Sequence, residues 1–282
     1  MKKLVYILFA LALISTSCSK DDVIKENPPI GNPDEGEDDT PIDKTETQRV
    51  VITAHVEDKF ILPSGTRCDA EFYDADGTKL DCKKFLSAAS EHSFYVGAEL
   101  EKGKQYTCLI WIDNGQYGYD LSNGLKNIRM TTKPGLAFHG KLDFNSKSTK
   151  YELEMKPAVA QVILKLKEHM LTGNGLFSFS EDTPVKYVFD VSAGTVVSTD
   201  VAYIPQTVFL LNNIGKVAEL YTFVPDDGMY VNLNADFKDK SIAFNNIPLE
   251  MGCVTTLDCD WTTTDFDITV TDMRADETDI EF

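Results

Sequence analysis

The sequence predicts an all-β protein with one β-sandwich in each half of its folded part. Apolar and polar residues alternate with period two in short segments, and turn residues separate these segments roughly every eight to twelve positions. Few windows have the 3.6-residue periodicity of an amphipathic helix. The hydrophobic fraction of 43% and the aromatic fraction of 10% can supply two cores, so a folded, globular body is expected.

Residues 1–17 are predicted to be an export signal that ends at a lipidated cysteine. Lys2 and Lys3 precede an apolar run from Leu4 to Ile14, and small polar residues then lead to Cys18. Such a run spans about 16 Å as a helix, roughly half of a bilayer core, so it cannot be a lasting membrane span. The pattern resembles a bacterial lipoprotein signal, although Ser15 stands where an aliphatic residue is more usual. A plain secretory signal with a chance cysteine is the alternative.

Residues 18–48 are predicted to be a lipidated, acidic and disordered tether. Acidic side chains outnumber lysines there, an aliphatic pattern is almost absent, and prolines recur at 28, 29, 33 and 41. A segment of this kind cannot bury enough apolar surface to offset the entropy lost on ordering. We therefore expect an extended spacer that holds the folded part away from the membrane.

The N-terminal sandwich is predicted over residues 49–170. Its first strand runs from Arg49 to Glu57, and Asp76-Gly77 is expected to turn a hairpin between the strands 67–74 and 79–86. The long apolar run 151–167 can be a helix or a strand, and Pro157 with its β-branched neighbours favours the strand. Its buried face is expected to consist of Ala160, Val162, Leu164 and Leu166. The remaining strands are expected at 94–100, 105–112 and 137–144.

A C-terminal sandwich is predicted over residues 171–270, after a junction at Thr172-Gly173-Asn174-Gly175. Its strands are expected at 186–191, 207–211, 218–224, 229–237, 241–247, 253–261 and 266–270. Residues 271–282 carry five acids and one arginine and are predicted to form a loose, acidic tail.

The charge and the cysteines exclude several classes of function. A formal net charge of −18 repels phosphates, so nucleic acid is not an expected partner. The cysteines lack the C-x-x-C spacing of a zinc or redox site, and the histidines are scattered, so neither a metal nor a cofactor is predicted. A disulfide between Cys68 and Cys82 is possible outside the cytoplasm, and buried inert thiols are the favoured alternative. The pairing of Cys108, Cys253 and Cys259 stays open.

An enzyme is not predicted. The sequence has no G-x-S-x-G elbow, no H-E-x-x-H pair and no glycine loop that could hold phosphates. Asp74 and Asp76 before Gly77 resemble part of a calcium loop, but the closing glutamate is missing, and hairpin chemistry explains them better.

The segment most suited to a ligand contains Trp111, Tyr117 and Tyr119 beside glycines and carboxylates. Aromatic rings on such a loop can stack on sugar rings while the polar side chains bind sugar hydroxyls. The favoured alternative is that Trp111 ends a core strand and that the tyrosines cover its edge.

An ordered set of segments resembles the fimbrillin-like surface lipoproteins of the Bacteroidetes, and the similarity covers most of residues 49–270. Its members in the N-terminal half are Glu99–Trp111, Ala137–Gly140 and Tyr151–Val162, and in the C-terminal half Asn246–Leu249, Thr255–Leu257 and Phe266–Val270.

This resemblance implies two tandem transthyretin-like, or Ig-like, sandwich domains and assembly by β-strand exchange. In the fimbrial members, an arginine-directed protease releases the first strand, and a strand of the neighbouring subunit fills the groove. Arg67 is the position here that matches such a cut, and an ordinary loop arginine in an uncut protein is the alternative. The resemblance also reads Ser19, Lys20, Asp21 and Asp22 as a signal for export to the outer face of the outer membrane.

Two functions of different classes are therefore predicted. The first is a non-catalytic fimbrial subunit or fimbria-associated adhesin, held in the outer membrane by lipid on Cys18. Its partners would be other fimbrial subunits or ligands on host and bacterial surfaces. The second is a carbohydrate-binding surface lipoprotein of a nutrient uptake system, which would use Trp111, Tyr117 and Tyr119.

Overall fold

A computed structural model describes residues 46–60, 62–114, 118–132, 134–167, 173–210, 215–237 and 240–273. All of them belong to one compact unit, Lys44–Phe282. Every regular element in that part of the chain is a β-strand, so the all-β prediction is confirmed. No helix within it is long and apolar enough to cross a membrane. The predicted signal and nearly all of the tether lie outside the described residues.

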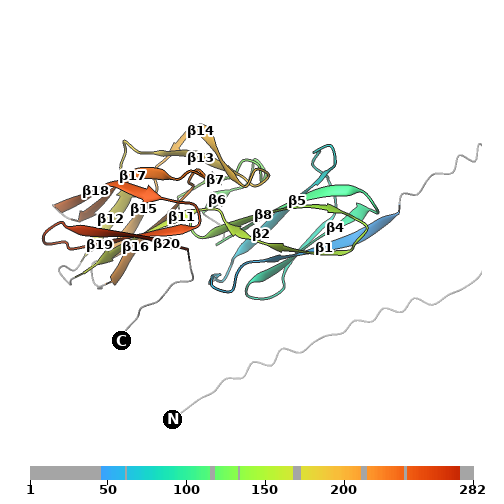
Figure 1. The fold of residues 1–282 in the computed structure, drawn as a ribbon, viewed down its shortest axis with the longest axis horizontal. Coiled ribbons are helices and arrows are strands. Elements are labelled where there is room, and N and C mark those ends of the chain that lie inside the picture. The colour runs from blue at the N-terminus through green and yellow to red at the C-terminus, as the bar shows by residue number, and fades with distance from the viewer. Residues whose placement is uncertain are drawn as a thin grey trace, which may run out of the picture. The chain divides into compact units, whose positions relative to one another are not determined.

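The N-terminal half folds into a sandwich-like body of two four-stranded sheets (Figure 1). One sheet has the order β3-β4-β1-β9 and the other the order β10-β8-β5-β2. The first sheet contains β1 (Thr47–His55), β3 (Lys84–Ala88), β4 (Ser93–Glu101) and β9 (Lys150–Glu154). The second contains β2 (Arg67–Asp74), β5 (Gln105–Asp113), β8 (Ala137–Asn145) and β10 (Lys156–Pro157), and a small ribbon joins β6 (Tyr119–Asp120) to β7 (Arg129–Met130).

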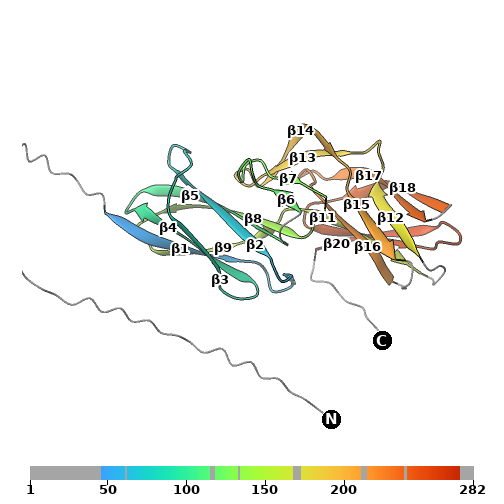
Figure 2. The same ribbon diagram turned by 180° about the vertical axis from the view of Figure 1, so that it is seen from behind.

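The C-terminal half repeats this architecture with the sheets β16-β11-β19-β20 and β15-β12-β17-β18 (Figure 2). In each half the first strand lies between an antiparallel and a parallel partner: β1 between β4 and β9, and β11 between β16 and β19. The strands are β11 (Ala160–Leu166), β12 (Asn174–Phe179), β15 (Gln206–Leu210), β16 (Gly215–Thr222), β17 (Met229–Phe237), β18 (Lys240–Leu249), β19 (Cys253–Cys259) and β20 (Phe266–Asp272). A separate hairpin consists of β13 (Val185–Asp190) and β14 (Thr195–Tyr203).

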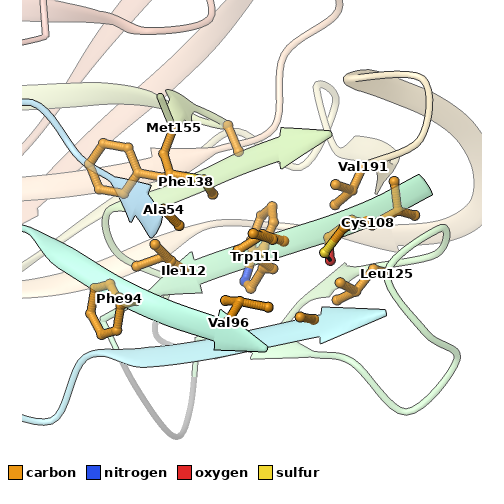
Figure 3. Close-up of a cluster of buried hydrophobic side chains, with 14 of the residues drawn as sticks. Ala54, Phe94, Val96, Cys108, Trp111, Ile112, Leu125, Phe138, Met155 and Val191 are labelled. Atoms are coloured by element: carbon orange, nitrogen blue, oxygen red, sulfur yellow. Dashed lines mark hydrogen bonds between the residues drawn. The ribbon is translucent and has the colours of Figure 1, made fainter. Parts of the chain in front are cut away.

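The alternation of β1 explains its place in the fold. Val50, Ile52 and Ala54 have no exposed surface, whereas Val51 and Thr53 on the other face are half-buried. Because successive side chains of a strand point to opposite faces, one face of β1 packs into the core and the other remains accessible. The core of this body contains Trp111, which is drawn in Figure 3 among labelled neighbours that include Val96 and Ile112.

The run 151–167 consists of strands, as predicted, but it is divided among three of them. β9 and β10 pair within the N-terminal body, and β11 pairs with β16 and β19 in the C-terminal body. The predicted buried face of β11, which consists of Ala160, Val162, Leu164 and Leu166, is confirmed. The change of partners thus occurs at the buried Ala158 and Val159, before β11, whereas the expected junction at 172–175 follows that strand.

The predicted hairpin after β2 is correct only at its turn. The Asp74 carboxylate accepts the backbone N–H groups of Asp76 and Thr78 at 3.0 and 2.9 Å, and Gly77 adopts a φ of 77°. The return pairs with β2 only at Lys79 and Leu80, and the chain then leaves for the other sheet, where Lys84–Ala88 pairs with β4. A continuous strand from 79 to 86 is therefore wrong, because β3 completes the sheet of β1.

Four strands escaped prediction, and one extends further than expected. Two of the four, β6 and β7, have only two residues each. β12 begins within the glycine-rich segment that indicated a turn, and β14 is exposed on most positions, so its pattern lacks alternation. β20 continues to Asp272, and the buried Met273 donates its N–H to the Gly252 carbonyl at 2.7 Å. The first residues of the predicted tail are therefore ordered, and residues 274–282 lie outside the description.

Candidate functional site

Two of the predicted site residues, Arg67 and Trp111, bind one buried carboxylate that sequence reasoning did not single out. Asp113, the last residue of β5, has no exposed side-chain surface. Its Oδ2 accepts the indole N–H of Trp111 at 2.8 Å and the guanidinium of Arg67 at 2.5 Å. The same guanidinium donates to the backbone carbonyl of Tyr119 at 3.2 Å. A lone acid directly after an apolar strand segment is the only sequence signal that could have indicated this centre.

Arg67 is not a loop residue. It is the first residue of β2 and lies opposite Asp113 in the antiparallel register with β5. Its Nε lies 3.2 and 3.3 Å from the two Asp113 oxygens, and its side chain is 33% exposed. Paired N–H donors on a carboxylate are the strong form of an arginine ion pair. The arrangement anchors the start of β2 to the end of β5.

This anchoring bears directly on proteolysis. A protease needs several residues on both sides of the cut bond free and extended, but residues 67–74 are all paired with β5. Cleavage after Arg67 therefore requires the start of β2 to open locally. Burial, with the nearby Asp69 and Asp113 carboxylates, raises the pKa of the Cys68 thiol to about 12, so this thiol stays protonated and inert.

The cysteines of the described chain are free thiols. Cys68, Cys82, Cys108, Cys253 and Cys259 form no disulfide, so the possible Cys68–Cys82 bridge is not present. Burial raises the pKa of Cys108 well above its ordinary value, and the neighbouring Cys68 and Cys82 raise it further. The described residues also contain no group of three or more histidine, cysteine or acidic side chains that could hold a metal ion.

Trp111 and Tyr119 do not form the predicted sugar platform. Trp111 is 0% exposed, and the ring of Tyr119 packs edge-on against it with centroids 5.3 Å apart. Phe189 packs against Trp111 as well, at 5.6 Å, and the Tyr119 hydroxyl donates to the Gly135 carbonyl. Rings without exposed surface cannot stack on a sugar, so the core alternative holds for both. Tyr117, like Cys18 and residues 19–22, lies outside the described residues.

A groove of about 650 Å³ lies on the outer face of the β3-β4-β1-β9 sheet. Two adjacent cross-strand rows line it. One row is Phe85, Gly97, Val51 and Lys150, and the other is Ser87, Tyr95, Thr53 and Glu152. Arg49 closes the groove at one end, and its guanidinium carbon lies 4.3 Å from the centre of the Phe85 ring. The volume falls within the range of about 300–1,000 Å³ that is typical of ligand sites.

The comparisons with known proteins establish the fold. No protein-family model and no curated protein sequence matches this chain. A solved structure of a provisional cell adhesion protein from Bacteroides uniformis matches with a TM-score of 0.54 and 12% identity, over 79% of this chain and 97% of that one. A provisional cell adhesion protein from Bacteroides ovatus matches with 0.51 and 12%, over 81% and 98%.

The structure is also similar to the fimbrial anchor protein Mfa2 of Porphyromonas gingivalis, with a TM-score of 0.43 and 14% identity over 80% of this chain and 99% of that protein. The two Bacteroides structures span nearly the whole described body, so this chain has the fold of those two provisional cell adhesion proteins. At identities this low, the likeness extends to the fold alone.

Proposed function

We propose that this chain is a non-catalytic, fimbrillin-type adhesion protein, held in the outer membrane by lipid on Cys18 and exposed at the cell surface. The lipoprotein-like signal and the acidic tether support the anchoring, and the fold likeness to provisional cell adhesion proteins of Bacteroides supports adhesion. In this proposal each body is a transthyretin-like sandwich, and residues 19–22 direct export. Fimbrial subunits or surface ligands are the partners.

The position of β1 is the observation that supports assembly by strand exchange. β1 is the first strand after the tether, and it pairs with β4 on one side and β9 on the other. Val50 and Ile52 on its inward face are fully buried, and each contributes up to roughly 1.5–3 kcal/mol through apolar burial. Release of β1 would leave two unpaired edges and an apolar groove. A donated strand could restore both the hydrogen bonds and the packing.

In this proposal the cut at Arg67 is conditional. The intact chain stays tethered through Cys18, and the Arg67–Asp113 ion pair resists cleavage until the start of β2 opens. Once cut, the folded body keeps no covalent link to its lipid and must be held by neighbouring subunits.

The test uses the full-length chain in detergent and an arginine-specific protease. We expect cleavage of the bond after Arg67, identified by mass spectrometry, followed by oligomers measured by light scattering. Arg67→Lys is the matched control, because it keeps the positive charge but removes the protease site. Cleanly cut protein that stays monomeric would refute strand exchange. Oligomers of uncut Arg67→Lys under the same treatment would refute the role of the cut.

The second candidate function is carbohydrate binding, and the segment with Trp111 and Tyr119 does not support it. Trp111 and Tyr119 belong to the core, so substitution of either would unfold the body before it tested any glycan contact. A sugar would need an accessible surface with aromatic and polar side chains, and the groove over the β1 sheet has this composition.

A further inference from the structure

We propose that the groove on the outer face of the β3-β4-β1-β9 sheet binds an acidic oligosaccharide, that is, a glycan that carries carboxylated sugars. This inference goes beyond the proposed adhesive and assembly function, because it assigns a ligand class to a defined surface. It does not depend on cleavage or on strand exchange.

The floor of the groove follows from the strand register. Gly97 lies between Phe85 on β3 and Val51 on β1 in one cross-strand row. A Cβ atom at Gly97 would lie 3.2 Å from the Val50 carbonyl oxygen and 3.7 Å from the Phe85 side chain. These distances leave little room for a side chain at this position, so Gly97 keeps the floor of the groove low between Phe85 on β3 and Val51 on β1.

Tyr95 and Phe85 provide the surface on which a sugar ring can stack. Tyr95 is 47% exposed, and Phe85 lies on the neighbouring strand. Sugar rings expose C–H groups on their flat faces, and these pack on aromatic rings. The hydroxyls of Ser87 and Thr53 and the carboxylate of Glu152 line the same rows and can bind sugar hydroxyls.

Arg49 and Lys150 give the groove its preference for an acid. Within the described residues, neither side chain forms an ion pair, although Glu99 lies opposite Arg49 and Glu152 is close to Lys150 in sequence. Stacking on Phe85 orients the Arg49 guanidinium and leaves its N–H donors available for a carboxylate. Because the chain as a whole carries a charge of −18, an anion is attracted only where cations gather locally.

The site is complete only while β1 is in place. Arg49, Val51 and Thr53 all come from this strand, so its release would remove the floor and one of the two cations. Strand exchange and glycan binding on one molecule are then mutually exclusive. An intact, tethered chain would hold the glycan, and a cut chain would lose it.

The experiment measures binding of the uncut full-length chain in detergent to an array of acidic oligosaccharides. The probes are oligogalacturonates, hyaluronan fragments and sialylated glycans, each printed beside its methyl-esterified or desialylated neutral counterpart. We expect at least one acidic probe to bind, its neutral counterpart to bind roughly tenfold or more weakly, and the affinity to fall as salt is raised. Isothermal titration calorimetry then measures the affinity of the chain for the best probe.

Substitutions separate this site from the rest of the surface. Arg49→Gln, Lys150→Gln and Tyr95→Ala change outward-facing side chains, and each should weaken the best probe by about tenfold or more. Arg129→Gln and Tyr230→Ala are the controls, because these residues lie on β7 and β17, outside the groove, and Tyr230 is 73% exposed. Unfolding temperature checks that every variant is folded.

The inference would be overturned if the wild type bound no acidic probe, or if acidic and neutral counterparts bound equally. Binding that survives all three groove substitutions would overturn it as well. A failure of strand exchange would leave these measurements unaffected, since they use uncut monomer. Conversely, oligomers formed after cleavage would support strand exchange but would not support glycan binding if the uncut chain binds no acidic probe.

Discussion

The ion pair between Arg67 and Asp113 should contribute measurably to stability, and Asp113→Asn tests this. The substitution keeps the shape of the side chain but removes the charge that faces the Arg67 guanidinium at 2.5 Å. It also forces either the amide NH₂ or a single acceptor oxygen to face two donors, the guanidinium and the Trp111 indole N–H. Asp113 is fully buried, so water cannot replace the lost interaction there.

The expected loss is about 2–3 kcal/mol in the free energy of unfolding. Removing one partner of a fully buried pair costs about 3–5 kcal/mol, and the one-third exposure of Arg67 reduces that value because solvent screens its charge. Urea unfolding followed by circular dichroism measures the change. Local opening of β2 should become easier as well. If the free energy of this opening falls by about 2 kcal/mol, cleavage after Arg67 should be roughly 30-fold faster.

A double-mutant cycle identifies the ion pair as the cause. In an Arg67→Met background, which keeps the apolar stem of the side chain, Asp113→Asn should cost at least about 1 kcal/mol less than in the wild type. Equal costs in the two backgrounds would refute the coupling. A loss below about 0.5 kcal/mol for the single variant would refute the reasoning as a whole.

Three further predictions concern the core and its pH dependence. Burial lowers the pKa of His139 from 6.5 to about 4; the nearby Lys156 lowers it further, and Asp226 raises it by a smaller amount. Between these pH values the unfolded chain therefore binds more protons than the folded chain. Stability should therefore fall by up to about 3 kcal/mol as pH drops from 6.5 to 4 and stay level above 6.5, and His139→Gln should flatten the curve. Ile52→Ala should cost about 2–5 kcal/mol in urea unfolding because it leaves a cavity beneath β1, and a cost below 1 kcal/mol would argue against the buried position of this strand. Glu71→Ala should cost about 1–3 kcal/mol, because the buried carboxylate accepts the Tyr73 hydroxyl at 2.6 Å, and an unchanged urea midpoint would contradict that role.

Much of the fold could be predicted from local sequence because strand alternation is a local property. The inward face of β1 and the four apolar positions of β11 follow from period two alone, and Asp74 and Gly77 specify their turn by their own chemistry. β14 lacks alternation, so the period-two pattern could not predict this strand. The prediction of a return strand after Gly77 was wrong for a related reason, because a turn signal does not indicate how far the strand pairing continues.

An all-β body in two halves could be predicted from the sequence and is confirmed, and the export signal and acidic tether stay predictions, since composition and periodicity are read along the chain. Which side chains meet depends on the three-dimensional packing of the sheets. This packing buries Trp111, pairs Arg67 with Asp113, and aligns Arg49, Tyr95 and Lys150 around one groove. Alternation gives the face of a residue but not the neighbouring strand, because pairing between segments as far apart as β1 and β9 depends on the register of the whole sheet.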